Sequence, residues 1–174
     1  MNIFLLDWDH EQCARWHCDK HVVKMPLETT QMLSTVHWRY DEPGPYRPVH
    51  QKHPCTLWAG QTLTNYQWLL KLGLALCDEY TYRYGKVHGC QKVLQLLTNA
   101  PQQLTAQGFT PFAQAMPPEY KDHDPIAAYR RYYINDKARL CVWKTRPTPP
   151  WMQQAMLSLS QRENEQQLVA QPKA

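Results

Sequence analysis

The first group of residues that could perform chemistry follows the apolar residues at the N-terminus. On a helix that advances about 100° per residue, Cys13, His17 and His21 share one face. Imidazole exchanges protons near neutral pH, and a lysine amine becomes nucleophilic where it is desolvated or lies beside another cation. We therefore predict that Asp19, Lys20 and His21 are catalytic. A solvated surface position for Lys20 is the alternative.

The same histidines allow a metal site. Two histidines four residues apart on a helix are a known two-ligand spacing. His50 and His53 could complete a set with His17 and His21. The spacing matches no standard zinc signature, so we expect no metal and no other cofactor. A divalent metal held by these four side chains stays open as the alternative.

A second group, over residues 78–88, interleaves carboxylates, aromatic rings and bases. Glu79 is the carboxylate here that could do acid–base work, and we predict that it is catalytic. Tyr82 could stack on a nucleobase while its basic neighbours hold phosphates. These neighbours are Arg83, Lys86 and His88. The alternative is a helix end whose basic residues complement the helix dipole while the tyrosines pack in the core.

A third group combines tyrosine with basic residues nearer the C-terminus. Tyr129, Tyr133 and Lys137 line one strip of a helix, and Arg130 lies seven residues before Lys137. A basic, aromatic helix suits a phosphate backbone, whereas a solvated charged face over packed tyrosines is the alternative. The full set that we predict to bind nucleic acid is His17, Arg47, His50, His53, Tyr82, Arg83, Lys86, His88, Tyr129, Arg130, Lys137 and Arg146.

Hydrophobic spacing predicts the helices that position these groups. An extended segment over residues 2–6 leads into a helix capped by Asp7 or Asp9. Pro26 either kinks that helix or starts a second one, and Gly85 suits the left-handed end of the longest helix. The predicted helices cover residues 10–24, 26–39, 56–84, 88–98 and 124–140, and Pro-rich loops cover 41–54 and 99–123.

The predicted fold class is mainly α: a single-domain helical bundle with an extended N-terminal segment and long Pro-rich loops. The 174 residues are 43% hydrophobic, which is enough for one core. We place the helical domain at residues 1–151 and expect 152–174 to be a polar tail, either a frayed helix or disordered. Seven Trp, ten Tyr and eight His against three Phe favour half-wet pockets and stacking surfaces over a dry core.

Charge and hydropathy indicate the compartment and the partners. The net charge of +4 permits an anionic partner such as nucleic acid. No run approaches the roughly 18 apolar residues of a membrane span, and Asp7 comes too early for a signal peptide. We therefore expect a cytoplasmic protein with six free cysteines that binds DNA or a nucleotide and no membrane. The sequence does not determine the oligomeric state.

Several segments carry a resemblance that covers about residues 1–151. They are similar to a family of short phage and bacterial proteins, most of them without an assigned function. The segments are His-Cys-Asp-Lys-His-Val-Val-Lys-Met at 17–25, His-Pro-Cys-Thr-Leu-Trp-Ala at 53–59, Asn-Tyr-Gln-Trp-Leu at 65–69, Glu-Tyr-Thr-Tyr-Arg-Tyr-Gly-Lys-Val-His at 79–88, Ala-Met-Pro-Pro-Glu-Tyr-Lys at 115–121 and Ala-Tyr-Arg-Arg-Tyr-Tyr at 128–133.

The chain also resembles, more loosely, the phage pyrimidine-dimer DNA glycosylases, which are small helical enzymes. The likeness rests on the extended N-terminus before the first helix, the Pro-led middle helix, the segment 118–121 and the aromatic, basic C-terminal part. It implies an amine that attacks the sugar and forms a Schiff base, assisted by a first-helix carboxylate. That family exposes the amine by removing methionine before a small residue, whereas asparagine follows here. The nearest carboxylate is Asp19, and Lys20 would replace the terminal amine.

These observations favour a DNA-acting enzyme with glycosylase or lyase activity on modified or damaged bases. One alternative is a metal-assisted or acid–base enzyme acting on a nucleotide or a small phosphorylated substrate. Another is a non-catalytic module that binds nucleic acid or a host protein. The first hypothesis predicts that one cleft gathers side chains from all three groups, namely Asp19, Lys20, His21, Arg47, His53, Glu79 and Arg130.

Overall fold

The structure is a computed structural model that describes the backbone of residues 1–169 and the side chains of residues 1–161. The described part of the chain contains helices and loops and no strand, so the prediction of a mainly α fold is confirmed. The α-helices are α1 (His10–Trp16), α2 (Asp19–Arg39), α3 (Pro54–Ala59), α4 (Leu63–Tyr84), α5 (Gln91–Leu96), α6 (Pro125–Tyr132) and α7 (Pro150–Val169).

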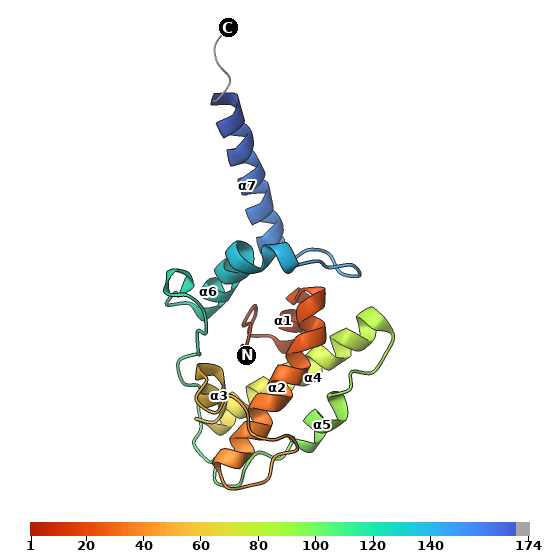
Figure 1. Ribbon diagram of the computed structural model, residues 1–174, viewed down its shortest axis with the longest axis vertical. Coiled ribbons are helices and arrows are strands. Elements are labelled where there is room, and N and C mark those ends of the chain that lie inside the picture. The colour runs from red at the N-terminus through yellow and green to blue at the C-terminus, as the bar shows by residue number, and fades with distance from the viewer. Residues whose placement is uncertain (170–174) are drawn as a thin grey trace.

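Helix α4 is the centre of the body, because it packs against both α1 and α2 (Figure 1). The shared core is built from fully buried side chains that include Leu69, Leu72 and Leu76 of α4 and Met32 and Leu33 of α2. Figure 1 shows that α7 projects away from this body beyond α6. Residues 152–169 of the predicted polar tail are therefore helical, and residues 170–174 lie outside the described part.

Local capping explains where several helices begin and end. Asp9 and Asp124 cap α1 and α6, because their carboxylates accept hydrogen bonds from the amides of Gln12 at 2.7 Å and Ile126 at 2.9 Å. Gly85 ends α4 with a φ of 64°, a left-handed conformation that glycine adopts without strain. The cap predicted at Asp7 or Asp9 is thus Asp9, the left-handed end predicted at Gly85 is confirmed, and Asp124 caps the helix at the start predicted for it.

The single helix predicted over residues 10–24 is wrong, because the chain is extended at His17 and Cys18 between α1 and α2. Distant partners replace the helical hydrogen bond that would join the two halves. The Arg15 carbonyl accepts from Arg83 Nη2 at 2.9 Å, and the Asp19 amide donates to the Val142 carbonyl at 2.9 Å. Both backbone groups stay satisfied, so the break carries no penalty for unpaired polar atoms.

Two further helix boundaries differ from the sequence prediction. Pro26 lies inside α2 and starts no second helix. The helix predicted over residues 56–84 is two helices, because the Thr62 hydroxyl caps a new start at Leu63 by accepting from the Asn65 amide at 3.0 Å. The loop before it also ends earlier than predicted, at His53, which caps α3.

The extended segment before α1 lies in the interior. Ile3, Leu5 and Leu6 are at most 1% exposed, and Phe4 packs among the aromatic rings of α2 and α6. The chain end therefore lies in the body of the molecule, beside α1 (Figure 1). Across the described residues, every helix is too short or too polar to traverse a bilayer.

Candidate active site

The terminal amine lies beside a buried carboxylate. Glu28 of α2 is 7% exposed, and its Oε2 lies 3.6 Å from the Met1 amine. The same oxygen accepts a hydrogen bond from the Asn2 amide at 2.9 Å. Lys24, one helical turn earlier, reaches Glu28 Oε1 at 3.2 Å from its exposed side of α2. Glu28 therefore holds the first two main-chain nitrogens of the chain.

The main chain of Met1 is less buried than its side chain. The side chain is 2% exposed, whereas the residue as a whole is half-buried. The accessible atoms of this residue are thus mostly main-chain atoms. The side chain packs against the core and anchors the chain end there.

Asn2 and Tyr129 position the chain end from the opposite side. The Asn2 side chain donates to the Ala115 carbonyl at 2.9 Å, and its Oδ1 lies 3.0 Å from the Tyr129 hydroxyl. That hydroxyl also lies 2.7 Å from the Ala113 carbonyl. Burial raises the pKa of Tyr129 well above its usual value, so the phenol stays a neutral hydrogen-bonding group. Tyr129, predicted to bind nucleic acid, is fully buried beneath the chain end.

The start of α3 forms the third wall. The Cys55 thiol lies 3.7 Å from Asn2 Oδ1. The backbone amide of Cys55 donates to His53 Nδ1 at 3.2 Å. Burial raises the pKa of Cys55 to about 12, so this thiol stays protonated. Burial also lowers the pKa of His53, and the nearby terminal amine lowers it further. Two histidines of the predicted binding set, His50 and His53, therefore lie at this site, with ring centroids 6.5 Å apart.

An amine next to a buried carboxylate is equipped for Schiff-base chemistry. A neutral amine attacks an electrophilic carbon, and a carboxylate that already contacts it can accept or return the protons. The structure supplies both groups without moving the backbone, since the carboxylate is fixed by the Asn2 amide and Lys24.

The residues predicted to be catalytic on the first helix do not share this site. Lys20 is exposed and borders a hollow of 440 Å³ with Tyr84 and Val142. His21, the next residue, points into the core, where it stacks on Phe4 at 4.3 Å and hydrogen-bonds the Tyr133 hydroxyl. Consecutive helical residues are about 100° apart, which explains the separation. The expected single cleft is therefore wrong.

Asp19 and Glu79 belong to a buried ion-pair network. Arg83 donates to Glu79 Oε1 at 2.7 Å and to Asp19 Oδ1 at 2.9 Å, and its side chain is 1% exposed. Arg146 binds both oxygens of Glu79, at 3.0 and 2.9 Å. Burial opposes ionisation, but these hydrogen bonds keep the pKa of Glu79 below its usual value. Both Glu79 oxygens are engaged, so the network joins α1, α2, α4 and the segment before α7.

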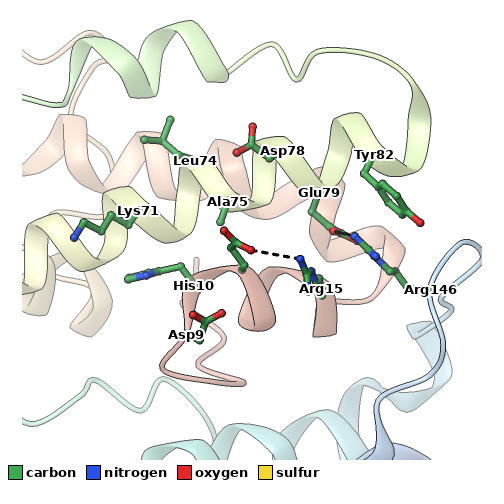
Figure 2. A pocket seen from close by; sticks show the side chains of 11 residues that line it. Asp9, His10, Arg15, Lys71, Leu74, Ala75, Asp78, Glu79, Tyr82 and Arg146 are labelled. Atoms are coloured by element: carbon green, nitrogen blue, oxygen red, sulfur yellow. Dashed lines mark hydrogen bonds and ion pairs between the residues drawn. The ribbon is translucent and has the colours of Figure 1, made fainter.

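A polar pocket of 530 Å³ opens beside this network (Figure 2). The Arg146 guanidinium stacks over the ring of Tyr82 at 3.8 Å at its rim. Figure 2 shows Glu79 and Arg146 facing each other from α4 and the C-terminal segment, with Asp78 one residue away. The lining combines acidic with basic side chains, and Glu11 pairs with Arg15 as Glu79 does with Arg146, so its charges nearly balance. It is formed by Asp9, His10, Glu11, Arg15, Lys71, Leu74, Ala75, Asp78, Glu79, Tyr82 and Arg146.

The remaining predicted binding residues lie apart from one another. Arg130 donates to the Leu6 carbonyl at 3.0 and 2.9 Å and stacks over Trp16, while Lys137 pairs with Asp136. His88 bonds the Val23 carbonyl at 3.0 Å. Arg47 and Lys86 are exposed.

The four histidines proposed as metal ligands form two pairs. His17 and His21 have ring centroids 6.4 Å apart inside the core, and His50 and His53 lie beside the chain end. Within residues whose side chains are described, no group of three or more histidine, cysteine, aspartate or glutamate side chains is arranged to hold a metal ion.

Sequence reasoning did not single out Glu28. A signal was present, because Met25, Glu28, Thr29 and Met32 follow the three-and-four spacing of a buried helix face. A carboxylate on such a face needs a buried partner, and the terminal amine provides one here.

Comparison with known protein families matches residues 1–92 to the family described as pyrimidine dimer DNA glycosylase. The matched region contains the terminal amine, Glu28 and His53, and it ends before Tyr129 and Arg146. The predicted resemblance to this family is confirmed over that region. No curated protein and no solved structure matches the chain.

Proposed function

This chain belongs to the pyrimidine dimer DNA glycosylase family, and on that premise we propose that it is a DNA glycosylase with lyase activity on damaged pyrimidines. The observation that carries the proposal is the contact between the terminal amine and Glu28. This pair has the two groups that base excision through a Schiff base requires.

The chemistry divides between the two groups. The neutral amine attacks C1′ of the damaged nucleotide; the N–C1′ bond forms, and the glycosidic bond breaks with its electron pair leaving on the base. The amine proton passes to Glu28. The C1′–O4′ bond then opens to give the protonated imine, and Glu28 returns its proton to O4′, while water protonates the departed base. In the lyase step Glu28 removes a C2′ proton, and the 3′ phosphate departs by β-elimination.

The terminal amine is a better candidate nucleophile than Lys20. Glu28 Oε2 contacts both the Met1 and the Asn2 nitrogen, so the carboxylate faces the amine whether or not methionine is removed. Lys20 is exposed, and Asp19, its neighbour at the same hollow, is already engaged by Arg83 at 2.9 Å and by the Lys144 amide at 3.2 Å. Glu28 Oε2, in contrast, faces the terminal amine.

Charge favours a DNA path over the chain-end face. Exposed Lys24 contacts Glu28, exposed Lys52 precedes His53 in sequence, and cationic side chains attract the phosphate backbone. The pocket beside Glu79 offers no excess of positive charge, because its basic side chains are balanced by carboxylates. Affinity for a damaged duplex should therefore fall as salt rises, and Lys24→Ala and Lys52→Ala should weaken it.

Borohydride trapping tests the chemistry. The protein is incubated with a duplex that carries one abasic site, and with an ultraviolet-irradiated duplex, in the presence of borohydride. We expect a covalent adduct whose tryptic peptide contains the N-terminus. Glu28→Gln should slow base excision and strand cleavage about a hundredfold or more. Glu11→Gln, which changes an exposed carboxylate on α1, should leave the rate unchanged.

Two further arms identify the nucleophile. Reductive methylation of the terminal amine, or an uncleaved N-terminal extension, should abolish the adduct, whereas Lys20→Ala should retain it. An adduct that maps to Lys20, or trapping that survives the N-terminal block, would overturn the assignment. Unchanged turnover in a folded Glu28→Gln protein would do the same.

A further inference from the structure

His53 has one ring nitrogen engaged and one free. It is the cap of α3, and its Nδ1 accepts a hydrogen bond from the Cys55 amide at 3.2 Å. An accepting Nδ1 carries no proton, so the neutral ring carries its proton on Nε2. Among the described residues, Nε2 has no hydrogen-bond partner. His53 therefore presents a free N–H donor.

This donor lies at the edge of the candidate active site. Cys55, two residues after His53, contacts Asn2. Asn2 in turn follows Met1, which bears the terminal amine. The titratable groups that face His53 are the terminal amine, His50 and Glu28. Burial, the terminal amine and His50 lower the pKa of His53, and Glu28 opposes them. The ring is consequently neutral at pH 7 and donates a hydrogen bond without giving up its proton.

We propose that His53 Nε2 donates a hydrogen bond to a non-bridging phosphate oxygen next to the nucleotide that the amine attacks. The inference rests on the proposed function, since it places the deoxyribose at the amine. Each deoxyribose carries a phosphate on either side. The exposed basic side chains near His53 in sequence favour that anion. His53 contacts the substrate directly and holds its sugar in register with the nucleophile.

Two substitutions separate this role from helix capping. Asparagine places an acceptor near the position of Nδ1, so His53→Asn keeps the cap and loses the distant donor. Glutamine places an amide near the position of Nε2, so His53→Gln keeps a donor and loses the cap. We expect His53→Asn to bind a duplex carrying a reduced abasic-site analogue about tenfold more weakly, with its melting temperature unchanged. His53→Gln should melt lower and bind more tightly than His53→Asn.

A modified substrate identifies the acceptor. Methylphosphonate replaces one non-bridging oxygen by a methyl group, at the phosphate 5′ or 3′ of the analogue in separate duplexes. At the contacted phosphate, wild type and His53→Asn should bind equally, whereas at the other phosphate the tenfold difference should persist. A difference that persists at both positions, or affinity that follows thermal stability across the two variants, would overturn the inference.

These binding measurements do not depend on catalysis. A wild type that binds the analogue but forms no borohydride adduct would reject the proposed lyase chemistry and still test His53. A wild type that shows no preference for the analogue duplex over an undamaged one would reject both.

Discussion

His17 should make the fold sensitive to acid. It is fully buried at the break between α1 and α2. Its Nδ1 donates to the Cys13 carbonyl at 2.7 Å, and its Nε2 is buried with no hydrogen-bond partner. A second proton would therefore place a positive charge in the core without an acceptor. Burial lowers the pKa of His17 to about 3, against an ordinary value of 6.5, and the nearby His21 and Arg83 contribute to the decrease.

The sign and size of the effect follow from linkage. Below pH 6.5 the unfolded chain binds a proton at this position, and the folded chain does not until about pH 3. Lowering the pH across this window therefore destabilises the fold. At pH 5, which is about 1.5 units below the ordinary pKa, protonation stabilises the unfolded state by about 2 kcal/mol relative to the folded state. The stability is fully present above the unfolded pKa.

Urea unfolding at pH 7 and pH 5 measures this loss. His17→Asn is the matched variant, because its amide can still donate to the Cys13 carbonyl but does not titrate. The free energy of unfolding of the wild type should fall between the two pH values by about 2 kcal/mol more than that of the variant. All other ionisable groups are common to both proteins, so the difference isolates His17. Parallel decreases in the two proteins would refute the reasoning.

Two other substitutions follow from the network and the chain end. Glu79→Gln leaves Arg83 and Arg146 without their shared buried carboxylate, so the free energy of unfolding should fall by about 3 kcal/mol; a loss below about 0.5 kcal/mol in urea unfolding would contradict the burial of this network. Tyr129→Phe removes the hydroxyl beside Asn2 and the Ala113 carbonyl, which should cost about 1–2 kcal/mol and slow borohydride trapping; trapping at the wild-type rate would show that this hydroxyl does not position the amine.

Local sequence signals predicted some helix ends correctly and missed others. The Asp9 and Asp124 carboxylates and the left-handed Gly85 act through atoms within a few residues, so the sequence alone contains the information. The break at His17 was invisible, because Arg83 and Val142 supply the competing hydrogen bonds from far along the chain.

The candidate site was predicted only in part. His50 and His53 were placed in a functional group because imidazole suits chemistry, and the structure brings both beside the terminal amine. Glu28 was missed because a lone glutamate in a helix is usually a solvated side chain. The role of Glu28 depends on its contact with the chain end, where Asn2 lies 26 residues away from it in sequence. That juxtaposition arises only when the N-terminal segment packs into the core.

The long-range contacts at the chain end also constrain how the protein is made. Asn2 meets Tyr129 across a sequence separation of 127 residues, so the first residues to leave the ribosome must wait for the synthesis of Tyr129 before their surroundings are complete. At translation rates of about 5–20 residues per second, that wait is on the order of ten seconds. Throughout it the extended segment before α1 lacks the ring of Tyr129, which later packs edge-on against Phe4. This end of the chain therefore completes its packing only after α6 has been made.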